Sequence, residues 1–275
     1  MCKIPRPEVN FLLGTSQIRR TVVGNLCKMD SKTVNKELNS VIRPLLKQNG
    51  FDKFSGRTYW RYHSDRIDIL NFQSFNSYNA DVLGCTTFSF TVNLSVYLTY
   101  LPEKTKIKEK EGILRPEEFQ GHFRGGIKKG FEQPEFPRKD IWFIDNKGEN
   151  IQTAINDCKN QIKKTGLDWY NKFDTKEKIF AILTEDEMDM DGTWGFGNFD
   201  SPNRNELIAY TANELGQTDI ATQKLQRLID FNKEQYEIMK YDYYLEQIKS
   251  INKEIERIKT THNSGNCCTT PIFRK

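Results

Sequence analysis

Apolar and polar side chains alternate along residues 86–101, and this pattern constrains the fold more than any other in the chain. The polar positions are mainly Thr, Ser and Asn. Successive side chains of a strand point to opposite faces, whereas a helix would scatter these apolar groups around its surface. The pattern therefore predicts a strand with one apolar face, in an antiparallel sheet covered on one side. The apolar positions are Phe88, Phe90, Val92, Leu94, Val96, Leu98 and Tyr100.

Three further stretches have the composition of strands, and helical patterns flank them. Residues 57–62 (RTYWRY) and 66–75 (RIDILNFQSF) precede the long strand, and residues 141–144 (IWFI) follow it. We therefore expect an α+β fold with an antiparallel meander sheet of about four strands, covered by helices on one face. The intervening residues 101–140, rich in Lys, Glu, Gly and Pro, are predicted to form a long loop or flap.

The C-terminal third has a helical pattern. Ser201-Pro202 is typical of a helix start and Gly216 of a helix end, so this region predicts a helix, a short turn and a second helix as an αα-hairpin. Neither Gly nor Pro occurs between Gly216 and Gly265. We therefore predict one long helix over residues 219–260, about 60 Å long, which projects from its domain as a coiled-coil or docking element.

These patterns divide the chain into four segments. Residues 1–30 lack clean periodicity and are expected to be an N-terminal extension. Residues 31–218 form the α+β sheet domain, and residues 219–260 form the long helix. The polar residues 261–275 are expected to be a disordered tail.

Composition restricts the chemistry of the chain only weakly. There are 41 basic and 37 acidic residues, a net charge of +4, which gives no strong general attraction to nucleic acid or to membranes. None of the six cysteines has CxxC spacing, and no stretch resembles a signal peptide or a membrane span. We therefore expect a reduced cytoplasmic protein without a cofactor.

Several local patterns together are similar to those of a known family. They are LLKQNGF, GRTYWRY, DILNFQSF and FSFTVNLSVY, and later Trp142, TGLDWYNKF and NELIAYTANELGQTDIATQKL. Over roughly residues 34–231 the chain resembles the bacterial domain of unknown function 4304 family. That family has no settled biochemical activity, so the resemblance implies a bacterial α+β module and assigns no catalytic residues. The N-terminal extension and the long C-terminal helix depart from the family pattern.

The first functional hypothesis concerns the predicted long helix. Its apolar residues recur mostly at steps of three and four, which is typical of a helix that packs on another surface. We interpret the chain as a non-catalytic interaction or scaffold subunit of a bacterial intracellular complex, binding a protein partner or a second copy of itself. The expected docking residues are Tyr236, Met239, Tyr243, Ile248, Ile251, Ile255 and Ile258.

The alternative hypothesis uses charged residues in two predicted loops. Arg124, Lys128 and Lys129 surround a Gly-Gly pair and could contact phosphate, although the spacing of an NTP-binding loop is absent. Asp189 and Asp191 are weak candidates for cation ligands. These residues suggest a nucleic-acid-associated accessory protein or a cation-dependent hydrolase, with membership of an antiviral defence complex as a vaguer extension. No catalytic motif is visible, which favours a non-enzymatic role.

Overall fold

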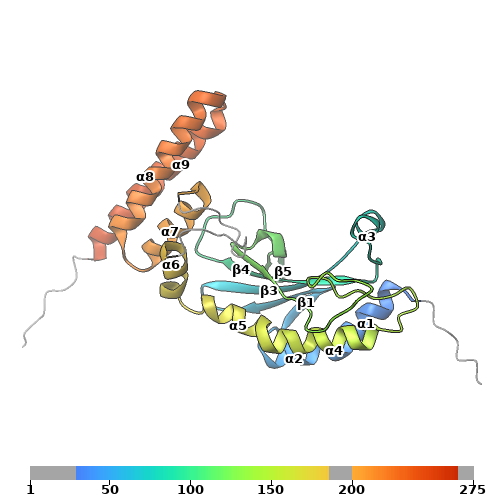
Figure 1. Ribbon diagram of the computed structural model, residues 1–275. Coiled ribbons are helices and arrows are strands. Elements are labelled where there is room, and N and C mark those ends of the chain that lie inside the picture. Colours follow the sequence, from blue (N-terminus) through green and yellow to red (C-terminus); the bar gives the residue numbers. More distant parts are fainter. Residues whose placement is uncertain (1–28, 186–199, 266–275) are drawn as a thin grey trace, which may run out of the picture.

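The computed structural model describes residues 29–185 and 200–265. It confirms the α+β class: an antiparallel sheet lies against helices in one part, and a pair of long helices projects from the other (Figure 1). The expected N-terminal extension lies outside the described residues except for its last two. Residues 266–275 of the expected tail also lie outside them, whereas residues 261–265 belong to the last helix.

The main sheet has five antiparallel strands in the order β1-β2-β3-β4-β7. Its centre is the pair β3–β4, in which Leu70 lies opposite Leu94 and Asp68 opposite Val96. Consecutive strands β1 to β4 pair with their neighbours, so the predicted meander is confirmed, and β7 adds an outer strand beside β4. The strands are β1 (Lys53–Ser55), β2 (Thr58–Tyr62), β3 (Arg66–Ser74), β4 (Phe90–Leu98) and β7 (Phe123–Gly126).

One face of the sheet packs against helices, as the alternation in β4 predicted. The even-numbered residues of β4, from Phe90 to Leu98, are buried in the main core. Helices lie along this face (Figure 1), and each buried Leu or Phe of this kind contributes about 1.5–3 kcal/mol. These helices are α1 (Ser31–Val41), α2 (Arg43–Gln48), α4 (Ile151–Gln161) and α5 (Leu167–Tyr170).

The opposite face is also partly covered, which the sequence pattern did not predict. Trp60, Ile67, Ile69 and Tyr97 form a second cluster with Ile107 from the segment after β4. This segment contains a small hairpin of β5 (Lys108–Lys110) and β6 (Ile113–Arg115), a 3-10 turn η1 (Glu118–Gln120) and then β7. Residues 101–140, predicted to form a long loop or flap, therefore contain four short elements, and the rest of this segment is loop and turn.

The predicted strands at 86–101 and 141–144 are shorter than expected. Before β4, Thr86 and Ser89 form a hydrogen-bonded turn, and the Thr86 hydroxyl donates to the carbonyl of Ile144 at 2.5 Å. Trp142 makes one bridge to Phe90, with N–H···O distances of 3.2 and 2.9 Å in the two directions. A short helix α3 (Ser77–Leu83) fills the link between β3 and β4.

The helical part begins with α6 and continues with three further helices. The predicted start at Ser201 is confirmed, because its side chain accepts from the amide of Arg204 and Pro202 is the first helical residue. Gly216, with φ of +72°, follows the end of α7, and α8 begins at Thr218. The predicted αα-hairpin is therefore formed by α7 and α8. The four helices are α6 (Lys176–Glu185), α7 (Pro202–Glu214), α8 (Thr218–Met239) and α9 (Asp242–Gly265).

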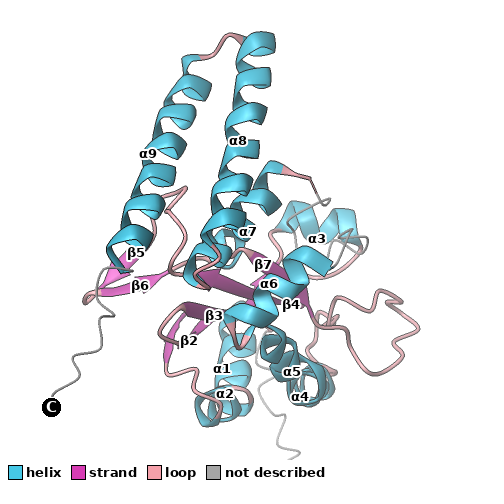
Figure 2. Cartoon of the chain, turned by 90° about the vertical axis from the view of Figure 1, so that its left-hand side faces the viewer, coloured by secondary structure: helices cyan, strands magenta, loops and turns pink. Residues whose placement is uncertain are grey.

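The predicted single helix over residues 219–260 is corrected to two helices, α8 and α9. The chain turns at Lys240, which has a left-handed backbone with φ of +54°, and α9 runs back along α8 (Figure 2). The physical reason is burial: Ile255 and Ile258 pack with residues of α7 and α8 in a separate core. The free energy of this packing outweighs the cost of about 1–2 kcal/mol for a left-handed non-Gly residue.

Candidate interaction surface

The turn between α8 and α9 carries a cluster of exposed apolar side chains. Ile238 is 70% exposed, Met239 48%, Tyr241 64% and Tyr243 60%. These four make up half of the large apolar residues that are exposed in the described part of the chain. We call residues 236–244 the hairpin tip. In Figure 2 it is the part of the hairpin farthest from the sheet. Clusters of this kind mark interaction sites more often than single exposed residues do.

The tip is exposed because α7 covers only the foot of the hairpin. At the foot, Ala209 and Ala212 of α7 pack with Leu225 and Ile229 of α8, and with Ile255 of α9. Two helices alone cannot bury these side chains from water, so α7 is needed as a third helix to enclose the core between α8 and α9. Beyond α7 the hairpin consists of two helices alone, so its apolar residues become progressively more exposed toward the turn.

The structure divides the seven predicted docking residues into two groups. Ile255 and Ile258 are buried in the hairpin core, and Ile248 and Ile251 pack partly against it. Tyr236 is half-buried at the tip, whereas Met239 and Tyr243 are exposed.

Ile238 and Tyr241 were missed because they lie outside the seam of apolar residues at helical spacing. The offset of that seam near Tyr243 is the sequence signal that could have located the turn. Only the turn makes these two side chains part of one exposed cluster.

Charges around the tip are of both signs. Lys240 pairs with Glu237 and lies 5.4 Å from the centre of the Tyr236 ring. Asp242 lies in the first turn of α9, where a carboxylate suits the helix dipole. An apolar centre with aromatic residues and a mixed polar rim is the usual composition of a protein–protein interface.

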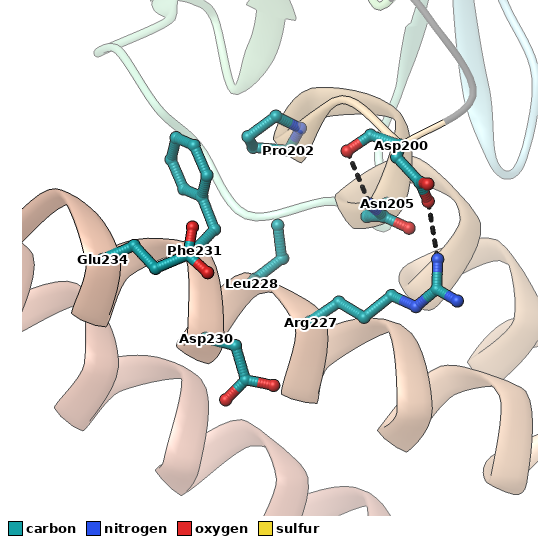
Figure 3. A pocket seen from close by; sticks show the side chains of 8 residues that line it. All are labelled: Asp200, Pro202, Asn205, Arg227, Leu228, Asp230, Phe231 and Glu234. Atoms are coloured by element: carbon teal, nitrogen blue, oxygen red, sulfur yellow. Dashed lines mark hydrogen bonds and ion pairs between the residues drawn. The ribbon is translucent and has the colours of Figure 1, made fainter.

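A shallow pocket of about 270 Å³ lies at the foot of the hairpin, between the start of α7 and α8 (Figure 3). Arg227 forms an ion pair with Asp200 at 2.6 Å, and the Asn205 amide donates to the Asp200 carbonyl at 3.1 Å. Both members of the ion pair are about half or more exposed, so the pair is screened by water and adds little stability. The remaining lining residues are Pro202, Leu228, Asp230, Phe231 and Glu234.

A buried charged cluster lies at the start of β3. Asp68 is fully buried and accepts from Arg61 at 2.8 Å, from His63 at 2.8 Å and from Arg66 at 3.2 Å. Arg66 also donates to the carbonyl of Asp174, which joins the sheet to the segment after α5. The carboxylate is saturated with donors, so this cluster holds the sheet and helices together and leaves no place for a substrate.

The three predicted phosphate-contacting residues do not form one site. Arg124 lies in β7 and pairs with Glu118 at 2.9 Å. Lys129 is buried and donates to Gln133 at 2.9 Å and to the carbonyl of Phe136 at 2.7 Å. Lys128 is exposed. Nucleic-acid binding stays a prediction, and these contacts give it no shared basic surface.

The acidic candidates Asp189 and Asp191 lie outside the described residues. Within the described ranges, no group of three or more His, Cys, Asp or Glu residues is arranged to hold a metal ion. None of the helices in those ranges is long and apolar enough to span a membrane.

Comparison with protein families gives one match. Residues 42–172 match the family described as domain of unknown function DUF4304, and no curated protein or solved structure matches the chain. The matched segment begins just before α2, includes the five-stranded sheet and ends after α5. The part of this chain that builds the sheet and the α4–α5 layer is therefore similar to DUF4304, and α7, α8 and α9 lie outside the match.

Proposed function

We propose that this chain is a non-catalytic protein-interaction subunit, in which the sheet domain is a scaffold and the hairpin tip binds a partner protein. The observation that carries the proposal is the cluster of four exposed apolar residues at the tip. Burying them in a partner would remove them from water, which is the main driving force of protein association. The partner then presents an apolar groove that receives the tip.

Helix α7 holds the hairpin in a fixed position relative to the sheet. Leu207 and Ile208 belong to the main core, and Ala209 and Ala212 in the same helix belong to the hairpin core. The hydroxyls of Tyr100 and Thr211 lie 3.1 Å apart and add a polar contact between the sheet domain and α7. A tip held in this way loses little conformational freedom when it binds, which favours affinity.

The size of the tip favours a partner with a groove over a second copy of this chain. A stable interface buries about 800 Å² on each partner, whereas four exposed side chains of this size offer on the order of 500 Å². Two tips in contact would bury no more than about 500 Å² on each copy, which is below the area of a stable interface. A groove also covers the flanks of α8 and α9, where Tyr236 and Tyr244 are half-buried. The mixed charges at the rim suit a protein more than an anionic lipid surface.

We further infer that the subunit acts in a bacterial cytoplasmic complex. The bacterial assignment rests on the family resemblance. Support for the cytoplasm comes from Cys85 and Cys158, which are free thiols in the described part of the chain. Burial raises the pKa of the Cys158 thiol well above its usual value, so this thiol is protonated and unreactive.

The experiment places a photo-cross-linking amino acid at position 241 in the full chain, expressed in its native cells. The same amino acid at position 78 is the control, because Tyr78 is exposed on α3, away from the hairpin. The protein captured from position 241 is then purified, and its affinity for the full chain is measured by calorimetry. The double variant Ile238→Asp, Tyr241→Asp is compared with Tyr78→Asp, Val82→Asp, which also changes two exposed apolar residues.

We expect the tip variant to weaken binding by about 100-fold or more, and the control variant to leave it unchanged. Equal affinities for the two variants would contradict the proposal. Cross-linking at position 241 that yields only a second copy of this chain, with dimers seen by sedimentation, would replace the groove partner by self-association.

A further inference from the structure

A second pocket, of about 230 Å³, lies on the sheet face opposite α1 and α4. We call it the sheet pocket. It is enclosed by the segment that returns over the sheet after β4, by η1 and by the first turn of α7. The sheet pocket is lined, among others, by Tyr97, Lys104, Ile107, Phe119 and His122.

The rings of Tyr97 and His122 lie in contact, tilted to each other, at the floor of the sheet pocket. The amide of His122 donates to the carbonyl of Val96 at 2.8 Å, so the chain pairs with β4 just before β7 begins. This pairing places His122 beside Tyr97, with ring centres 4.9 Å apart and an angle of 32° between the ring planes. Tyr97 is 4% exposed, so its ring position is fixed by packing.

The hydrogen bonds of His122 determine where its proton lies. The amide of Leu98 donates to Nδ1 at 2.9 Å, so Nδ1 is an acceptor and carries no hydrogen. Burial, together with the charge of Lys104, lowers the pKa of His122 to about 4, so the ring is neutral at pH 7. The single ring proton is then on Nε2. In the described structure neither this N–H nor the Tyr97 hydroxyl has a hydrogen-bond partner.

The sides of the sheet pocket are apolar, and the cation at its rim is already paired. Ile107 is buried in the wall, and Phe119 at the rim is 67% exposed. Lys104 forms an ion pair with Glu206 of α7 and donates to Asn203 at 3.1 Å. Because Lys104 is already paired with Glu206, it is not a free counter-ion for an anion, whereas the exposed Phe119 ring offers a surface for a flat apolar group.

We propose that the sheet pocket binds a small, neutral, planar molecule with a carbonyl oxygen, which accepts hydrogen bonds from His122 and Tyr97. The volume is below the range of about 300–1,000 Å³ that is common for drug-sized ligands, so the ligand has one or two rings. Its faces contact Ile107 and Phe119. This proposal rests on other residues than those of the hairpin tip, and either proposal can fail without the other.

The test uses uracil and nicotinamide as neutral carbonyl-bearing probes. Phenol is the probe without a carbonyl, and benzoate is the anionic probe. Each is titrated into the ¹⁵N-labelled full chain while the Nε2 resonance of His122 is followed by NMR. We expect a saturable shift with uracil or nicotinamide and a dissociation constant on the order of 1 mM, as befits a ligand of so few atoms. Weaker binding is expected for phenol and for benzoate.

Two variants remove one donor each and keep the fold. Tyr97→Phe deletes only the hydroxyl. His122→Asn removes Nε2 and keeps an oxygen near the position of Nδ1, where it can accept from the Leu98 amide. Each is expected to weaken binding about fivefold, measured by ligand-observed NMR, whereas Tyr241→Phe at the hairpin tip leaves it unchanged.

A third variant, Phe119→Ala, changes an exposed side chain that folding does not need, and it should also weaken binding. The proposal is overturned if neither neutral probe produces a saturable shift. It is equally overturned if benzoate binds more tightly than both neutral probes, or if binding survives unchanged in all three variants.

Discussion

At the scale of single residues, packing explains Gly125, which belongs to the Gly-Gly pair whose basic neighbours suggested a possible contact with phosphate. It lies in β7, and a Cβ added there would be 2.7 Å from Nε1 of the Trp169 ring. Real Cβ atoms essentially never approach other atoms so closely. The missing side chain therefore lets the Trp169 ring approach the strand, and contact with phosphate is not needed to account for this glycine.

Gly125→Ala is expected to lower the free energy of unfolding by about 1–3 kcal/mol, because the added methyl overpacks the contact with Trp169. Gly126→Ala is the matched control. The nearest atom to its added Cβ is 3.6 Å away, an ordinary contact, so its effect should stay within about 0.5 kcal/mol. Urea unfolding of both variants measures the difference. Equal losses would show that contact with Trp169 is not the reason for the glycine.

The pKa of His122 predicts a pH dependence of stability. Its value is about 4 in the folded chain, against 6.5 for an unperturbed histidine. Between these values the unfolded chain binds more protons than the folded chain, so stability falls as the pH falls from 6.5 to 4. The full contribution of His122 is on the order of 3 kcal/mol. We expect His122→Asn to lose that much less stability than wild type between pH 7 and pH 4 in urea unfolding. If the free energy of unfolding fell equally in both proteins, His122 would not be the source of the pH dependence.

At the scale of elements, the turn at Lys240 is the feature that sequence patterns could not locate. Many helices end at a left-handed Gly, often with Pro shortly after it, and neither residue is present here. The left-handed residue is a lysine, whose amide donates to the carbonyl of Tyr236 at 2.8 Å. Packing of Ile255 and Ile258 against α7 and α8 decides the position of the turn, and that packing involves residues far away in the sequence.

Lys240→Gly tests the turn directly. Glycine adopts a left-handed backbone without strain, so this change should raise the free energy of unfolding by up to about 1 kcal/mol. Lys233→Gly, in the interior of α8, should lower it by about 1 kcal/mol. Both lysines are exposed and form surface ion pairs at i,i+3 spacing, which makes them comparable, although only Lys240 also contacts the Tyr236 ring. If one continuous helix ran through position 240, both changes would be destabilising.

At the scale of the whole molecule, the sequence predicted what depends on local periodicity and failed where distant segments meet. The alternation in β4 identified the buried face and the α+β class, because every second residue of this strand lies in the core. Strands β1 and β7 are short, with three and four residues, and their pairing depends on the partner strand. The second covered face depends on Ile107, which a sequence pattern cannot place.

The candidate sites were predictable to different degrees for the same reason. Met239 and Tyr243 were identified from helical spacing, and the structure places both among the exposed residues of the tip. Ile255 and Ile258 share that spacing but serve the internal core, because the chain folds back. His122 and Tyr97 meet only through the pairing of β4 with the residues before β7, so neither signalled a pocket in the sequence.

Helix α7 lies between the sheet pocket and the foot of the hairpin. Its first turn supplies Asn203 and Glu206 to the rim of the sheet pocket through Lys104, and its middle carries the alanines on which the hairpin rests. Because α7 packs on both the sheet domain and the hairpin, a ligand that shifted this helix at the sheet pocket would also shift the foot of the hairpin. By thermodynamic reciprocity, a small molecule that stabilises one orientation of α7 would alter the affinity of the tip for its partner, and the partner would alter the affinity for the small molecule by the same factor.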